Sequence, residues 1–150
     1  MRREFSREAF FRAAGHFTPS VEVEWPSGRF FLSTADRDIS RVTFMSGPFG
    51  LAVLHRAARL LTEHTGAGIA GREVIEIGAN IGTTTVPLIT ELNAHRPHAF
   101  EPSPESHRLL RQTVIANGLE DVWSRTRWRS RIGRGTCRLS YLRAMPAVAA

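Results

Sequence analysis

The sequence lacks lysine altogether, has one cysteine, contains no long apolar run and carries no acidic residue after Asp121. With Cys137 as its only cysteine the chain cannot form an internal disulfide, which fits a reducing compartment. No run approaches the roughly 18 apolar residues that a membrane span requires. The first residues mix charges without an apolar signal core, so we expect no secretory signal and a cytoplasmic protein that does not enter a membrane.

The uneven distribution of acidic residues divides the chain into two parts of different net charge. Residues 1–121 hold 13 arginines and all 14 acidic residues, so this part is close to neutral. Residues 122–150 hold seven arginines and no acid, so the net charge of +6 belongs wholly to this tail. A chain of 150 residues with 42% hydrophobic residues is expected to form one globular core. The near-neutral part therefore argues against a nucleic-acid partner, which needs a basic surface.

The first 70 residues combine helical and strand patterns. The predicted elements are a helix over about 7–14 capped by Ser6, strands over 21–25 and 29–33 that form a hairpin, an irregular segment over 34–49, and an amphipathic helix over about 50–63. The hairpin prediction depends on period-two alternation and on the turn signal of Pro26, Ser27 and Gly28.

Residues 71–122 alternate short strands with helices. The predicted elements are a strand over 74–77, a tight turn from Gly78 to Gly82, a helix from Thr83 to about 93, a strand over 98–100, and a helix that Ser103 caps and Asn117 ends. Short connections between alternating strands and helices predict parallel strands in an open α/β sheet.

The turn after the first of these strands carries the main functional signal. Gly78 and Gly82 let the backbone turn sharply and let a nucleotide approach closely. The helix beyond the turn begins with unpaired N–H groups and a partial positive charge. The dinucleotide pattern G-x-G-x-x-G is absent, which counts against an NAD enzyme.

Two acidic residues flank this turn. Glu76 lies inside the strand, where a carboxylate suits the cationic amine of a methionine group and repels a pyrophosphate. Glu101 ends the next strand, 23 residues after Gly78. An ionised carboxylate at that spacing can accept hydrogen bonds from both hydroxyls of a ribose.

These motifs together resemble the FkbM-type methyltransferase family over roughly residues 20–122. The resemblance lies in the runs 74–88 and 99–105, in Leu109-Leu110 and Asn117-Gly118-Leu119, and upstream in Asp38-Ile39-Ser40 and Gly47-Pro48-Phe49. It implies a Rossmann-like class I methyltransferase fold with S-adenosylmethionine as cofactor. It also implies a small-molecule acceptor, because members of the family mostly methylate hydroxyl groups on sugars and natural products.

The resemblance implies a set of cofactor-binding residues in three groups. The loop group is Glu76, Gly78, Ala79, Asn80 and Gly82. The group beside the methionine part is Thr83 and Thr84, and the group at the ribose and adenine is Glu101, Pro102 and Ser103. No catalytic residue is assigned, because substrate binding and chemistry in class I methyltransferases lie beyond the fourth strand.

After Asp121 the chain departs from the family pattern. A third strand rich in valine and alanine is expected there, yet arginines recur without acids. We expect an incomplete fold of two or three parallel strands, with a lead-in over 1–70, a partial cofactor-binding core over 71–122 and a non-native or disordered tail over 123–150. A lysine-free chain indicates a GC-rich gene, and out-of-frame reading of such a gene yields much arginine. We therefore interpret the change as a frameshift near Val122 that removes the catalytic half.

Other interpretations stay open beside this one. The chain could be a nucleotide-binding module without catalysis, or the arginine tail with its tryptophans could bind nucleic acid, although we favour a tail without function. His95 and His98 could suggest a metal pair, but no further ligand lies at a suitable spacing, so we expect no metal. Asp36 and Asp38 are interpreted as turn residues rather than catalytic acids.

Overall fold

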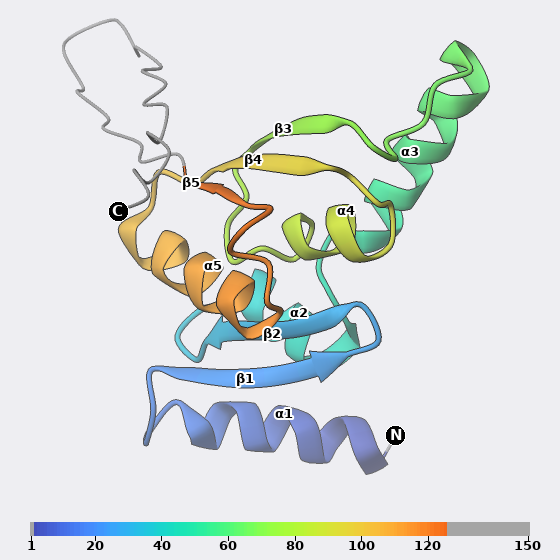
Figure 1. Cartoon of the computed structure of the whole chain (residues 1–150). Coiled ribbons are helices and arrows are strands. Elements are labelled where there is room, and N and C mark those ends of the chain that lie inside the picture. Colours follow the sequence, from blue (N-terminus) through green and yellow to red (C-terminus); the bar gives the residue numbers. More distant parts are fainter. Residues whose placement is uncertain (1, 126–150) are drawn as a thin grey trace, which may run out of the picture.

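The computed structural model describes residues 2–125, and it describes the side chains of residues 6–123. The predicted tail lies outside this part of the chain from residue 126 onward. The elements in chain order are α1 (Arg2–Ala14), β1 (Ser20–Trp25), β2 (Gly28–Ser33), α2 (Ile39–Ser46), α3 (Leu51–Thr65), β3 (Glu73–Ile77), α4 (Thr85–Thr90), β4 (Arg96–Phe100), α5 (Pro104–Ala116) and β5 (Ser124–Arg125) (Figure 1).

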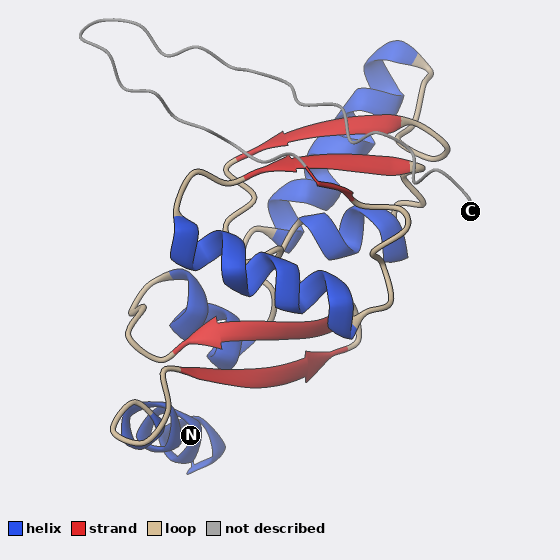
Figure 2. Cartoon of the chain, turned by 60° about the vertical axis from the view of Figure 1, so that its left-hand side comes forward, coloured by secondary structure: helices blue, strands red, loops and turns tan. Residues whose placement is uncertain are grey.

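The elements stack in layers (Figures 1 and 2). β1 and β2 form an antiparallel hairpin in which Ser20 lies opposite Ser33 and Trp25 opposite Gly28. α1 lies along the outer side of this hairpin, and α4 and α5 lie between the hairpin and a second sheet. The second sheet is parallel and has the strand order β3-β4-β5. The fold is therefore mixed α/β, and the predictions of a hairpin and of parallel strands are confirmed.

One hydrophobic core joins the hairpin to the helices. Its buried members are Phe11, Phe30, Leu32, Phe44, Ile81, Val86 and Leu109. Full burial of a side chain of this size stabilises the fold by about 1.5–3 kcal/mol. The core draws on both sides of residue 70, so the predicted lead-in and the predicted cofactor-binding core share a single interior.

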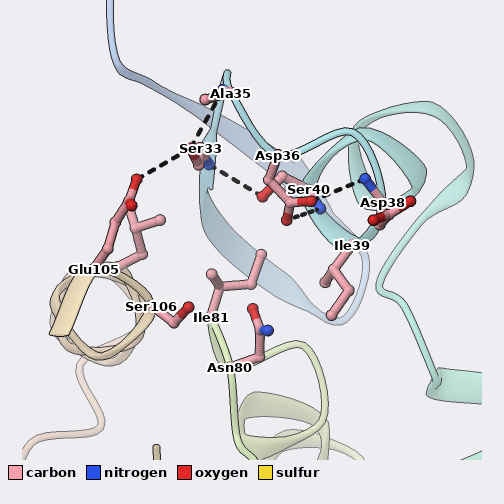
Figure 3. A pocket seen from close by; sticks show the side chains of 11 residues that line it. Ser33, Ala35, Asp36, Asp38, Ile39, Ser40, Asn80, Ile81, Glu105 and Ser106 are labelled. Atoms are coloured by element: carbon pink, nitrogen blue, oxygen red, sulfur yellow. Dashed lines mark hydrogen bonds between the residues drawn. The ribbon is translucent and has the colours of Figure 1, made fainter. Parts of the chain in front are cut away.

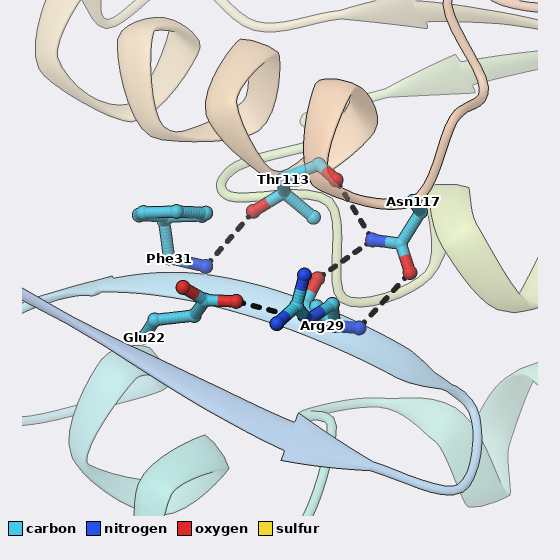
Figure 4. Close-up of polar contacts among 5 residues, drawn as sticks. All are labelled: Glu22, Arg29, Phe31, Thr113 and Asn117. Carbon is cyan, nitrogen blue, oxygen red and sulfur yellow. Dashed lines mark hydrogen bonds and ion pairs between the residues drawn. The ribbon is translucent and has the colours of Figure 1, made fainter.

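Side chains from the last turn of α5 and from Asn117 just after it close the open edge of β2 (Figure 4). Asn117 Oδ1 accepts the N–H of Arg29 at 3.0 Å, and Asn117 Nδ2 donates to the carbonyl of Arg29 at 2.7 Å. Thr113 Oγ1 accepts the N–H of Phe31 at 3.0 Å. A strand edge otherwise leaves such backbone groups without partners in the protein. The helix is therefore tied to the hairpin by polar contacts as well as by the shared core.

Two predictions for the N-terminal half are wrong. Ser6 lies inside α1, which begins at Arg2, so Ser6 does not cap the helix. Residues 34–49 were expected to be irregular, yet they contain α2. The Asp36 carboxylate stabilises the first turn of α2 by accepting the N–H of Ser40 at 2.9 Å. Phe44 anchors the helix by packing its side chain into the core. An eight-residue helix is too short for its apolar period to stand out in the sequence.

The helix after the glycine turn is shorter than predicted. α4 spans Thr85–Thr90, whereas the pattern predicts a helix from Thr83 to about 93. Asn93 has a φ of 53°, a left-handed conformation that lies outside the helical range. The N–H of Ala94 then bonds back to the carbonyl of Leu88 at 2.8 Å, which turns the chain into β4.

The parallel sheet continues past the expected boundary at residue 122. Trp123 is buried against Ala79, Leu110 and Val114. The two residues of β5 then pair with β4 in parallel, with Ser124 opposite His98. The large apolar surface of Trp123 favours its burial, so Trp123 belongs to the core, and the backbone of residues 124–125 belongs to the parallel sheet.

The opposite margin of the parallel sheet is open. Within the described residues β3 has a neighbour on one side only, and its Ile75 and Ile77 are 70% and 77% exposed. α3 lies near this margin and has no buried residue, although its apolar stripe predicts a buried face. None of the helices described in residues 2–125 is both long and apolar enough to cross a membrane.

Candidate functional site

The turn between β3 and α4 is held by its own backbone. The amides of Gly78 and Ala79 both donate to the carbonyl of Phe100, at 2.8 and 3.1 Å. The N–H of Gly82 donates to the carbonyl of Ala79 at 2.9 Å, and Asn80 takes a positive φ of 50°. Because these amides already have acceptors, the turn does not offer them to a pyrophosphate, in contrast to a dinucleotide-binding loop.

Glu101 fastens this turn from the end of β4. Its Oε2 accepts the N–H of Asn80 at 2.8 Å, and its Oε1 accepts the N–H of Ser103 at 2.8 Å. The residue is buried, and the two bonds join the end of β4 to the turn after β3. A carboxylate has about four acceptor positions, so two of them remain for a further donor.

Glu76 is bound to the start of α4. Its carboxylate accepts hydrogen bonds from the hydroxyls of Thr84 and Thr85, the latter at 2.6 Å. Burial raises the pKa of Glu76 above its ordinary value of 4.5, and the two threonine hydroxyls oppose this rise. The site therefore holds a carboxylate in low-dielectric surroundings, where a cationic ligand group would favour its ionised form.

A cavity of about 580 Å³ opens beside this carboxylate, along the edge of β3. Its volume lies within the range of small-molecule pockets, about 300–1,000 Å³. One wall is the end of β3 and the glycine turn, and the facing wall is the start of α3 together with Ile39 of α2. The lining is mainly apolar, and Glu76, Asn80 and the threonines supply its polar groups.

Six of the predicted cofactor residues line this cavity and four do not. The six are Glu76, Gly78, Ala79, Asn80, Thr83 and Thr84. The four are Gly82, Glu101, Pro102 and Ser103, of which Ser103 caps α5 by accepting the N–H of Ser106 at 3.4 Å. The role of each residue in binding a cofactor stays a prediction.

The two glycines of the turn have different surroundings. A Cβ at Gly78 would meet no atom within 4 Å, so this position leaves open space beside the cavity. A Cβ at Gly82 would lie 2.9 Å from Leu110 Cδ1 and 3.3 Å from Thr113 Cγ2. Gly82 therefore permits α5 to pack closely against the turn, whereas the sequence argument gave both glycines the same role.

The facing wall of the cavity was missed at the level of sequence. It consists of Ile39, Phe49, Gly50, Val53, Leu54 and Ala57. The apolar stripe of α3 is the sequence signal that could have revealed this wall. An apolar helix face that does not pack into the core is available to line a cavity.

A second cavity, of about 380 Å³, lies on the other side of Asn80 and Ile39 (Figure 3). Its polar lining comes from Ser33, Asp36, Asp38, Ser40, Asn80, Glu105 and Ser106, and among the described residues no arginine or histidine contributes to it. Asp36 accepts the amides of both Asp38 and Ser40 at 2.9 Å, so its interpretation as a turn residue is confirmed.

The histidines near β4 were considered as metal ligands. Within residues 2–125 no group of three or more histidine, cysteine, aspartate or glutamate residues is placed to hold a metal ion. His98 instead contacts Glu73 across the sheet, with 2.9 Å between Nε2 and Oε2. Cys137 and the arginines of the tail after Arg125 lie outside the described residues, so the nucleic-acid interpretation of the tail stays a prediction.

Comparison with known proteins adds little to this geometry. No protein-family model and no curated sequence matches the chain. A solved structure of Trm5 from Methanocaldococcus jannaschii in complex with adenosine is similar at a TM-score of 0.48 and 16% identity, over 71% of this chain and 28% of that one. So small a likeness carries no argument about function, and the resemblance to the FkbM-type family stays a prediction.

Proposed function

We propose that this chain is the cofactor-binding part of an S-adenosylmethionine-dependent methyltransferase of the FkbM type, with a Rossmann-like core. The observation that carries the proposal is the cavity along β3, where a half-buried carboxylate, Glu76, lies beside the open space at Gly78. A cofactor with a cationic amine and a nucleoside requires a carboxylate, an open glycine turn and an acceptor for the ribose.

The residues present fit such a cofactor. Glu76 would accept the methionine ammonium, and Thr84 orients its carboxylate. Glu101 lies outside the cavity lining, at the other side of the glycine turn, and it would accept ribose hydroxyls through the acceptor positions that its two amide bonds leave free. S-adenosylmethionine would supply an electrophilic methyl group on its sulfonium. The work of the chain is then to bind and orient the cofactor and to exclude water.

The second cavity supports a neutral acceptor that carries hydroxyl groups, such as a sugar or a natural product. It lies next to the first cavity, because Asn80 and Ile39 line both. Hydroxyls and carboxylates accept hydrogen bonds from hydroxyl groups. The described part of the chain brings no cation to this lining, which disfavours a phosphorylated acceptor.

A calorimetric titration with S-adenosylhomocysteine tests the cofactor assignment. The full chain is compared with Glu76→Gln, which removes one charge without changing the shape of the side chain. Glu73→Gln is the matched control, because it makes the same change at the other end of β3 and outside the cavity. Loss of a charge-assisted hydrogen bond costs about 1.5–3 kcal/mol, so we expect Glu76→Gln to weaken binding by roughly 10- to 100-fold.

The control is expected to bind like the unaltered chain. A folded chain that gives no heat with millimolar S-adenosylhomocysteine would overturn the cofactor assignment. If Glu76→Gln and Glu73→Gln bind S-adenosylhomocysteine with equal affinity, Glu76 is not part of the cofactor site. Tighter binding of NAD or adenosine than of S-adenosylhomocysteine would indicate a nucleotide-binding module instead.

A further inference from the structure

A cluster of cationic side chains surrounds a hollow between α1 and α2. The hollow has a volume of about 580 Å³ and is lined by Glu8, Arg12, His16, Arg37 and Arg41. It shares no residue with either cavity described above, so the proposed cofactor and acceptor sites do not account for it.

Glu8 organises two of these arginines. Its Oε1 lies 3.1 Å from Arg41 Nε, its Oε2 lies 2.9 Å from Arg41 Nη2, and Arg12 Nε lies 3.2 Å from Oε1. The hydrogen bonds of Arg41 hold the pKa of Glu8 below its ordinary value, so this carboxylate is ionised at neutral pH. Both guanidinium groups are thereby fixed at the wall of the hollow.

Arg37 and His16 complete the lining of the hollow. Within the described residues neither Arg37 nor His16 makes a hydrogen bond or an ion pair through its side chain, and one carboxylate stands against three guanidinium groups. Like charges that converge on one hollow repel one another, and a multivalent anion placed among them would relieve that repulsion. The three arginines and His16 come from α1, α2 and the loops after α1 and before α2, so the hollow presents donors from several directions.

We propose that this hollow binds the phosphate group of a small phosphorylated molecule. The planar fork of arginine matches the oxygens of a phosphate and binds them in pairs. Arg37 presents such a fork to the hollow, and Arg41, whose Nε and Nη2 contact Glu8, keeps its other N–H donors. The volume exceeds what a phosphate alone fills, which leaves room for a second phosphate or a sugar. Arg12 and Arg41 are 71% and 40% exposed, so the affinity is expected to fall as salt is added.

A titration of the full chain with inorganic pyrophosphate at low ionic strength tests the proposal. Arg37→Ala is the informative variant, because the Arg37 side chain makes no hydrogen bond or ion pair with another described residue. Its removal therefore leaves the Glu8 contacts with Arg12 and Arg41 intact. Arg56→Ala on α3 is the matched control, since it removes the same charge from an exposed helix outside the hollow. We expect Arg37→Ala to weaken binding by roughly tenfold, and the control to change it less than twofold.

Two results would overturn the proposal. One is the absence of heat with millimolar pyrophosphate, and the other is an equal loss in the two variants, which would indicate attraction to net charge alone. A parallel arm uses a short single-stranded RNA. The RNA could bind more tightly than pyrophosphate, with an affinity that both variants lower equally. That result would indicate non-specific electrostatic binding of nucleic acid and would overturn the phosphate site. Arg37→Ala is expected to leave the affinity for S-adenosylhomocysteine unchanged, so this test is independent of the cofactor assignment.

Discussion

The hairpin side and the β3 side of the molecule are built in different ways. On the hairpin side Phe30 and Leu32 have no exposed surface, and Asn117 closes the strand edge. On the β3 side Ile75 and Ile77 are mostly exposed, and a cavity separates the strand from α3. The difference indicates that the first region supplies the stability, whereas the second leaves surface free for binding.

The largest expected effect contrasts one apolar side chain from each region. Phe30→Ala removes a ring from the centre of the core and should lower the free energy of unfolding by about 3–5 kcal/mol. Ile77→Ala changes a side chain that is 77% exposed and should cost less than about 0.5 kcal/mol. Urea unfolding of both variants measures the contrast. Equal losses would show that β3 is buried in solution and would contradict the comparison.

A smaller effect is expected from the two glycines of the turn, whose φ values are both positive, 80° at Gly78 and 91° at Gly82. Alanine at either position costs about 1–2 kcal/mol of backbone strain. Gly82→Ala should cost about 1–3 kcal/mol more, because its Cβ would press on the buried Leu110. Thermal or urea unfolding measures the difference between the variants. If Gly78→Ala lowers the free energy of unfolding more than Gly82→Ala does, the space beside Gly78 is not open and the comparison is contradicted.

The smallest effect concerns pH and uses two glutamates of β3. Because burial raises the pKa of Glu76, the folded chain keeps this proton to higher pH than the unfolded chain does. Stability from this group is therefore fully present below about pH 4.5 and falls as pH rises through the folded pKa. Glu76→Gln lacks this fall, so it should become more stable relative to the unaltered chain as pH rises.

Glu73 provides the control with the opposite sign. The hydrogen bond with His98 lowers the pKa of Glu73, so its contribution is present above its ordinary value of 4.5 and is lost as pH falls. Glu73→Gln should become less stable relative to the unaltered chain as pH rises. Urea midpoints measured across pH 4 to 8 compare the two variants. Parallel pH profiles for both would contradict the assigned burial of Glu76.

Local signals predicted those elements that carry their own start and stop. The hairpin followed from alternation with a Pro-Ser-Gly turn, and α5 followed from Ser103 and Pro104 at its start. α2 was missed because its first turn depends on Asp36, which lies outside the helix, and on packing of Phe44 against α1. An element that is stabilised chiefly by its neighbours leaves a weak local signal.

The candidate site shows the same division. The glycine turn and the two acids beside it were predicted from the sequence. Positive φ values at Gly78 and Gly82 favour glycine strongly, and charged residues next to such a turn stand out in a sequence. The wall from α3 was not predicted, since it depends on how a helix distant in sequence is placed. The opposite environments of Gly78 and Gly82 also could not be read from one sequence.

By itself the sequence determined the hairpin, the parallel strands and the turn between Gly78 and Gly82, because hydrophobic period and glycine conformation act over a few residues. Only the tertiary structure decided that Gly82 serves the packing of α5, that Trp123 belongs to the core, and that three arginines meet around one hollow. The physical reason is that burial and charge convergence depend on contacts between segments far apart in the chain, which local pattern does not encode.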